Sequence, residues 1–203
     1  MPNRDQVGAT SGANARIDAR TQRSRETVLT AATELLESSG VGGFSVDEVS
    51  RRSGVAKTTI YRQWASREAL VLDACAGLDE RYDLPDTGTL RGDLRTFVAD
   101  LVGMVQHAAW ASVLPSIVDA AERNAAFAAM HAQIQQGHAS LVHQIADRAV
   151  ARGELSSDTD SALLVATVLG PVFYRRWFSR EPLDDAFIDA VVDRAIAAGT
   201  LTM

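Results

Sequence analysis

The stretch of sequence that decides the fold is FSVDEVSRRSGVAKTTIYRQWASREAL, residues 44–70. Ser45 opens a capping box, in which its hydroxyl accepts from the backbone three residues on while Glu48 reaches back. Gly54 separates two short apolar-periodic segments and can adopt the positive φ that a tight turn needs. With only Ser53–Ala56 between them, the two segments predict a helix-turn-helix.

The second of these helices has a polar open surface. Ile60 and Trp64, four residues apart, point inward and anchor it. The remaining side chains donate to phosphates or contact base edges. They are Lys57, Thr58, Thr59, Tyr61, Arg62 and Gln63. Many small helical hairpins also have charged faces, so on pattern alone DNA binding and a solvated surface both remain open.

The rest of the chain also has helical periodicity, so the predicted fold class is all-α. The expected helices run from Thr21 to Gly40, then from Ser66, and then over about 90–105, 110–123, 127–152, 160–179 and 187–198. Residues 1–20 lack apolar periodicity and are expected to form a disordered arm, either a solvated tail or an arm that reaches DNA. We expect an N-terminal helical domain over 21–66 and a second over 67–203.

Charge is distributed unevenly. The whole chain carries 20 basic and 26 acidic residues, a net −6 that argues against coating nucleic acid through bulk charge. Residues 1–70, however, hold 10 basic and 8 acidic side chains, whereas residues 71–203 hold 10 and 18. Only the first third is therefore suited to face a polyanion.

Composition narrows the class of protein further. A single cysteine, Cys75, excludes an intramolecular disulfide framework and any multi-cysteine zinc site. The longest apolar run, Ala162–Tyr174, is too short to cross a bilayer, and no secretory signal is visible. The sequence thus predicts a cytoplasmic protein with no membrane partner.

Residues 31–70 strongly resemble the TetR family, bacterial transcriptional regulators related to the tetracycline repressor. The resemblance rests on Gly54-Val-Ala-Lys-Thr-Thr-Ile-Tyr-Arg-Gln-Trp-Ala-Ser-Arg-Glu-Ala-Leu70. It implies that 21–66 is a three-helix DNA-binding domain whose third helix enters the major groove. It also implies that Ser45 caps the second helix near a phosphate, that Arg67 holds the DNA backbone, and that Tyr61 reaches a phosphate. Ala56 replaces the frequent serine or threonine, so the third helix lacks that cap.

The resemblance further implies a helical effector-binding and dimerisation domain over 67–203. The partners expected are double-stranded operator DNA, a second copy of the chain and a small-molecule effector of unknown identity. Repression is the commoner mode in the family, although activation occurs. Candidate effector-pocket residues, each also explicable as plain core, are Met104, His107, Trp110, Phe127, Met130 and His131. Candidate dimer-interface residues, which can instead pack on their own chain, are Tyr174, Trp177, Phe178, Phe187 and Val191.

Two rival functions belong to other classes of protein. Against an enzyme, the histidines lie near no carboxylate cluster, metal-site spacing is absent and Cys75 has no nucleophile signature, so no catalytic residue, metal or cofactor is expected. A helical adaptor that does not read DNA is the second rival, and the polar face of residues 57–63 discriminates it. If the regulator hypothesis holds, Lys57→Ala or Arg67→Ala flattens the salt dependence of operator binding.

Overall fold

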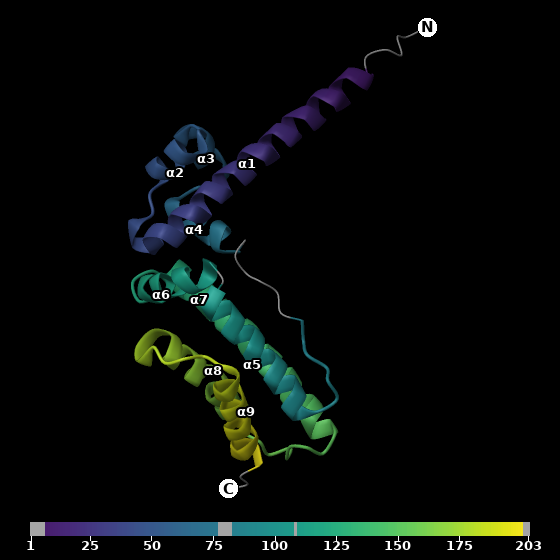
Figure 1. Ribbon diagram of the computed structural model, residues 1–203. Coiled ribbons are helices and arrows are strands. Elements are labelled where there is room, and N and C mark those ends of the chain that lie inside the picture. The colour runs from purple at the N-terminus through teal and green to yellow at the C-terminus, as the bar shows by residue number, and fades with distance from the viewer. Residues whose placement is uncertain (1–6, 77–82, 108, 201–203) are drawn as a thin grey trace. The chain divides into compact units, whose positions relative to one another are not determined.

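The computed structural model describes residues 7–76, 83–107 and 109–200, and it confirms the predicted all-α fold (Figure 1). No β-strand occurs in these ranges. The elements in chain order are α1 (Val7–Gly43), α2 (Val46–Ser53), α3 (Lys57–Gln63), α4 (Arg67–Ala76), α5 (Leu90–His107), α6 (Ala109–Ala121), α7 (Ala125–Ala151), α8 (Ser161–Tyr174), the π-helical turn η1 (Arg175–Ser179) and α9 (Asp185–Thr200).

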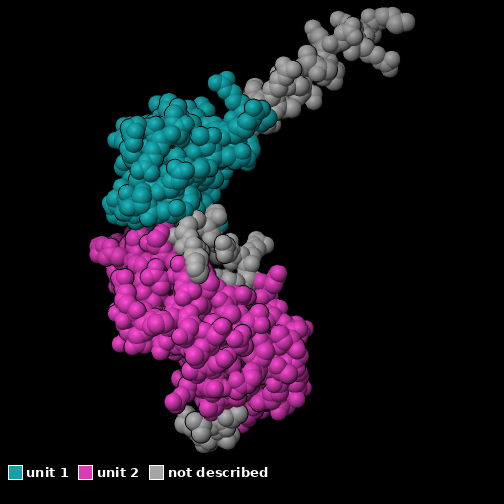
Figure 2. Space-filling model, in the orientation of Figure 1, with its two compact units in different colours: residues 1–79 teal, residues 80–203 magenta. Residues whose placement is uncertain are grey.

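The chain divides into two compact units, residues 1–79 and 80–203, coloured separately in Figure 2. The first unit contains α1 to α4, so the division falls near residue 80 and later than the predicted residue 67. The reason is that α4 packs on α1 and buries Leu70, Val71 and Ala74. Its apolar face therefore belongs to the core of the first unit.

Helix α1 begins at Val7 and not at Thr21. Residues 7–20, which the sequence predicted to be disordered, are helical, and residues 1–6 lie outside the described residues. This segment is rich in alanine, the residue with the highest helix propensity. Extending a formed helix also costs less than nucleating a new one. Figure 1 shows the first half of α1 extending past α2, α3 and α4.

The core of the first unit fixes α2 and α3 against the second half of α1. Its buried side chains come from all four helices and include Val28, Ala32, Leu35, Val46, Val49, Ile60, Trp64 and Leu70. Gly40, with φ 63°, interrupts α1 so that its last turn runs in a new direction before α2. Burying Ile60 and Trp64 leaves the rest of α3 facing outward.

The second unit is built around α5, which packs on α6, α7, α8 and α9. One face of α9 lies in this core: Phe187 and Val191 are 7% and 4% exposed. The acidic side of α9 meets α5, with Arg91 2.5 Å from Asp193 and Arg95 2.8 Å from Asp189. Phe187 and Val191, two of the predicted dimer-interface residues, are thus largely covered by their own chain, and whether a second copy contacts them stays a prediction.

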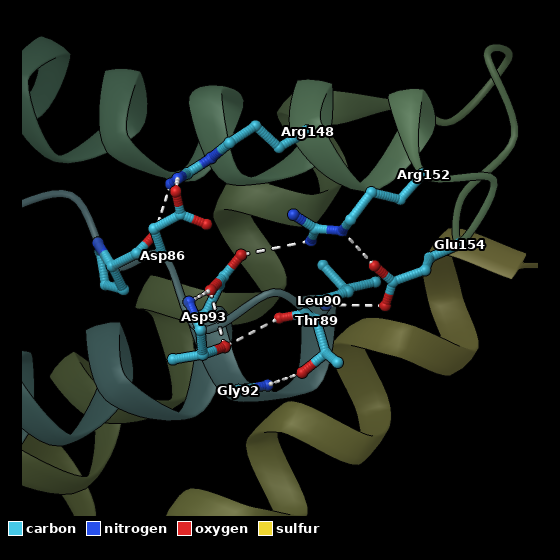
Figure 3. Close-up of polar contacts among 10 residues, drawn as sticks. Asp86, Thr89, Leu90, Gly92, Asp93, Arg148, Arg152 and Glu154 are labelled. Atoms are coloured by element: carbon cyan, nitrogen blue, oxygen red, sulfur yellow. Dashed lines mark hydrogen bonds and ion pairs between the residues drawn. The ribbon is translucent and has the colours of Figure 1, made fainter.

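A polar network fixes the start of α5 (Figure 3). The fully buried Asp93 carboxylate accepts from the Thr87 backbone N–H at 2.6 Å and lies 3.2 Å from Arg152. Glu154 accepts from the Leu90 N–H at 2.7 Å and from Arg152 at 2.5 Å. The bond from Glu154 satisfies a first-turn N–H that α5 itself leaves unpaired, and Asp93 ties Thr87, which precedes the helix, to its first turn.

The sequence predicted a single helix over 160–179. The α-helical part, α8, ends at Tyr174, and the chain continues directly into the π-helical turn η1. Tyr174 and Phe178 stack at 5.9 Å between ring centroids and are 60% and 76% exposed.

Within the described residues no single helix is both long and apolar enough to cross a membrane.

Candidate nucleic-acid interface

The caps of α2 and α3 set the geometry of the turn between them. Ser45 accepts from the Glu48 N–H at 3.2 Å, as the capping box predicted. The Glu48 carboxylate binds Arg51 and Arg52 at 2.7 and 2.8 Å, and these two side chains hold its pKa down at about 2. Gly54 ends α2 at φ 68°, and Ala56 begins α3 without a side-chain cap.

Helix α3 presents a polar face to solvent. Lys57, Thr58, Tyr61 and Arg62 are exposed, with Tyr61 50% exposed, while Ile60 is buried. Thr59 and Gln63 are half-buried, and among the described residues the buried Gln63 Oε1 has no hydrogen-bond partner. The predicted donors of α3 thus share one side of a short helix, and Gln63 is the least available of them.

Lys57 is not free on this face. Its Nζ forms an ion pair with Asp47 of α2, and both side chains are more than half exposed. An exposed pair of this kind contributes about 0–1 kcal/mol, because water solvates both partners well. A phosphate can therefore replace Asp47 as the partner of Lys57 at small cost.

Arg67, at the start of α4, has partners that the sequence did not indicate. Its Nε donates to the Phe44 carbonyl at 3.0 Å and its Nη2 donates to the Val41 carbonyl. The guanidinium also lies 5.7 Å from the Phe44 ring centroid. The arrangement ties α4 to the end of α1 and engages two of the five guanidinium N–H donors.

A second cluster links α1, α3 and α4 and was missed from the sequence. The Trp64 Nε1 donates to Asp73 at 2.7 Å, and Arg25 reaches the same carboxylate at 2.5 Å. The Arg25 guanidinium lies 5.2 Å from the centroid of the Trp64 ring. The three residues lie far apart in the sequence and no spacing joins them, but a buried tryptophan requires a partner for its N–H. This cluster fixes the end of α3.

Known proteins that resemble this chain share both units. Residues 28–74 match the family described as bacterial regulatory proteins, tetR family, and residues 84–195 match the tetracyclin repressor-like C-terminal domain. This chain belongs to the TetR family. The DNA-binding transcriptional repressor TetR of Mycobacteroides abscessus is 32% identical over 82% of this chain and 88% of its own length. An HTH-type transcriptional regulator of Mycobacterium bovis is 33% identical over 85% of this chain and 86% of its own.

A solved structure agrees with these relatives. The crystal structure of the TetR family transcription regulator SCO0332 superposes with a TM-score of 0.65, at 30% identity, covering 86% of this chain and 97% of that one. As a TetR-family member, the chain is a DNA-binding transcriptional regulator of a family without enzymatic function. The family match in the first unit ends at Ala74, so it includes α4, and it starts only at Val28. The first half of α1 therefore precedes it.

The effector candidates of this TetR-family chain fall into three groups. Met104 and Phe127 are buried in the core of the second unit. Met130 and His131 are half-buried on α7, and the His131 ring lies 3.2 Å from the Gln135 amide. The side chains of His107 and Trp110 lie outside the described residues. Two of the six candidates are thus core positions, and whether any of the six contacts a ligand stays a prediction.

The predicted dimer-interface residues at the end of α8 and in η1 differ in their exposure to solvent. Tyr174 and Phe178 are exposed, whereas Trp177 is half-buried and lies 5.4 Å from Phe173 between ring centroids. The exposed pair continues a row on the outer face of α8 that includes Leu163, 53% exposed, and Gly170. The outer side of α8, and not the apolar stripe of α9, is the uncovered apolar surface.

Chemistry other than binding has little support in the described residues. No group of three or more histidine, cysteine, aspartate or glutamate side chains there is arranged to hold a metal ion. Burial raises the pKa of the Cys75 thiol to about 12, so at neutral pH it is not the thiolate that a nucleophile requires.

Proposed function

We propose that this regulator binds a palindromic operator as a homodimer, represses transcription there, and is released by a small-molecule effector. The single observation that carries the DNA-binding part is the outward face of α3, with Ile60 and Trp64 anchored beneath it. Helix-turn-helix proteins insert such a helix into the major groove and read two half-sites about one helical turn apart.

The proposed roles divide among the eight candidate side chains. Thr58, Thr59 and Arg62 contact base edges, while Lys57 and Tyr61 hold phosphates. Ser45, which caps α2, directs that helix toward a phosphate. Arg67 acts through the backbone that it positions, since its Nε and Nη2 donate to the Phe44 and Val41 carbonyls. Gln63 has the weakest support, given its buried amide oxygen.

A gel-shift titration with the DNA upstream of its own gene tests this reading. Thr59→Ala and Tyr61→Phe are each expected to weaken binding of the dimer by about 5- to 150-fold, which corresponds to about 1–3 kcal/mol. Arg123→Ala, an exposed charge on the second unit, is the matched control and leaves binding unchanged. If wild type shifts no duplex even at low salt, the chain is a helical adaptor and the DNA-binding proposal fails.

The proposed dimer uses the outer face of α8. Leu163, Gly170, Tyr174 and Phe178 recur at helical spacing and are exposed in the single chain. Contiguous apolar surface of this kind is uncommon on monomers and marks interfaces. Gly170 leaves room for close approach of a second helix, since among the described residues no atom beyond its own stretch of helix backbone lies within 4 Å of where its Cβ would stand.

For the effector we propose an apolar molecule bound in the second unit among α5, α6 and α7. The supporting observation is that α5 and α7 pack on each other and carry the flexible and aromatic side chains Met104, Phe127 and Met130, with the polar His131 next to Met130 in the sequence. Release from DNA requires that the effector bind the non-operator conformation more tightly. Effector-dependent loss of the gel shift, abolished by Phe127→Ala, is the expected result.

A further inference from the structure

The net positive charge of residues 1–70 lies outside the part that matches the family. Residues 28–70 contain five basic and five acidic side chains and carry no net charge, whereas residues 1–27 contain five basic and three acidic ones. The excess of +2 that distinguishes residues 1–70 from the acidic remainder therefore comes entirely from the first 27 residues.

Ion pairs sharpen this contrast. Five of the basic side chains described in the first unit pair with carboxylates: Arg25, Arg51, Arg52, Lys57 and Arg67. Among the described residues, no ion pair involves Arg20, Arg23 or Arg62, and all three are exposed. Arg62 lies on α3, and the other two lie on the first half of α1, before the family match begins.

The position of these two arginines on α1 suits them to the same ligand as α3. Arg25 contacts the Trp64 ring, and Trp64 directly follows α3, so α1 passes the end of that helix. With a rise of 1.5 Å per residue, Arg23 and Arg20 lie about 3 and about 8 Å further along the axis. Three residues apart, they are neighbours on the surface of α1, and both are exposed.

We propose that the first half of α1 is a second nucleic-acid contact, in which Arg20 and Arg23 bind phosphates of the duplex that flanks the operator. The inference rests on the proposed DNA binding and adds a sequence-independent contact to it. Phosphate contacts fix position and affinity but carry no base information. Residues 28–70 carry no net charge, so the arginines of α1 supply positive charge that favours binding to DNA. This charge compensates for the repulsion between DNA and the acidic second unit.

The test compares wild type with the double variant Arg20→Gln/Arg23→Gln in the full chain. Binding is titrated against salt on two duplexes, the footprinted operator alone and the operator with about 10 base pairs added at each end, one helical turn. The variant is expected to lose about tenfold in affinity on the long duplex and nothing on the short one. The slope of log K against log salt flattens by about 1 for each phosphate that the variant no longer neutralises.

Two further arms complete the experiment. On a long duplex of random sequence, the double variant is expected to lose affinity by the same factor as on the long operator duplex. Thr59→Ala, in contrast, is expected to change the ratio of the affinity for operator to the affinity for random DNA. Arg123→Gln/Arg180→Gln removes two exposed charges from the second unit and is expected to match wild type.

The proposal is overturned if Arg20→Gln/Arg23→Gln binds both duplexes like wild type with an unchanged salt slope. It is also overturned if the control variant loses as much as the test variant, since bulk charge is then sufficient. Wild type that binds no duplex instead refutes the proposed DNA binding itself. An unchanged thermal unfolding curve separates these outcomes from misfolding of the exposed-site variant.

Discussion

The indole Nε1 of Trp64 donates to the carboxylate of Asp73 at 2.7 Å, and this bond joins the end of α3 to the middle of α4. The same carboxylate accepts from Arg25 of α1 at 2.5 Å. Asp73 is thus the point at which three helices of the first unit are held together. The orientation of α3 depends on α4 as well as on the core beneath it.

Asp73→Ala is expected to destabilise the first unit by about 2 kcal/mol, because it leaves the buried indole N–H without its charged acceptor. The measurement is the urea midpoint of unfolding of the first unit. Unfolding is monitored through the reaction of Cys75 with a thiol reagent, because this thiol is buried on α4 in the folded state. Asp47→Ala removes a carboxylate from an exposed pair and serves as the control, with a change of about 0.5 kcal/mol or less. Equal midpoints for the two variants would contradict the role of Asp73.

Asp47→Asn is expected to strengthen operator binding. Asp47 competes with phosphate for Lys57 and itself repels the DNA backbone. Removing an exposed pair of about 0.5–1 kcal/mol corresponds to a gain of about two- to fivefold in affinity at low salt. Glu37→Gln makes the same change of charge on α1, remote in sequence from the turn, and is expected to give a smaller gain. If both variants gain equally, net charge and not Lys57 accounts for the effect.

Arg67→Ala is expected to lower the stability of the first unit while leaving the salt slope of DNA binding unchanged. Arg67 donates to the Phe44 and Val41 carbonyls, so its loss costs about 2 kcal/mol of folding free energy and removes no phosphate contact. Lys57→Ala is the comparison and flattens the slope by about 1. A slope for Arg67→Ala as flat as that of Lys57→Ala would restore the phosphate role that the sequence predicted.

Local spacing in the sequence predicted part of the site, but it did not predict the partners of Arg67. The Ser45 cap, the turn at Gly54 and the burial of Ile60 and Trp64 follow from local spacing, and the structure has all of them. The Glu48 carboxylate, predicted to reach back to Ser45, binds Arg51 and Arg52 instead. The partners of Arg67 lie 23 and 26 residues away and depend on the kink that Gly40 introduces. No local pattern encodes that approach.

Two further features could not be determined from local sequence patterns: what covers the apolar stripe of α9, and where α1 begins. An apolar stripe on a terminal helix has the same sequence whether its own chain or a second copy covers it. Here α9 packs on α5 and α8, and the Arg175 guanidinium lies 4.1 Å from the centroid of the largely buried Phe187 ring. The first half of α1 has no apolar face to reveal a helix by periodicity, since it continues a helix whose core contacts begin near Val28.

Gly170→Arg is expected to convert the protein to a monomer. A side chain at this position meets no atom of the described residues within 4 Å beyond its own stretch of helix backbone, so the substitution is tolerated by the single chain. In a dimer that packs α8 against its copy, the same side chain clashes and buries a charge. Sedimentation velocity at micromolar concentration measures the result. Val118→Arg, at another exposed apolar position, is expected to leave the dimer intact.

The buried Asp93 predicts a dependence of stability on pH. Burial raises its pKa, but the Thr87 N–H, the Thr87 hydroxyl and Arg152 stabilise the carboxylate more strongly, and the net result is a pKa below the ordinary value. A carboxyl whose pKa is depressed in the folded state contributes stability above its unfolded pKa of about 3.9 and loses it as pH falls through the lower folded value.

Asp93→Asn is therefore expected to be less stable than wild type at pH 7, by about 1–3 kcal/mol for the missing charge-assisted bonds. The difference narrows as pH falls below about 4, because the carboxyl of the unfolded wild-type chain then takes up a proton, whereas the folded carboxyl, with its lower pKa, does so only at lower pH. Urea midpoints of the second unit between pH 7 and pH 3 measure this convergence. Asp158→Asn, on an exposed carboxylate, controls for charge removal alone. A gap between Asp93→Asn and wild type that is constant over this range would show that the network acts through shape and not through the charge of Asp93.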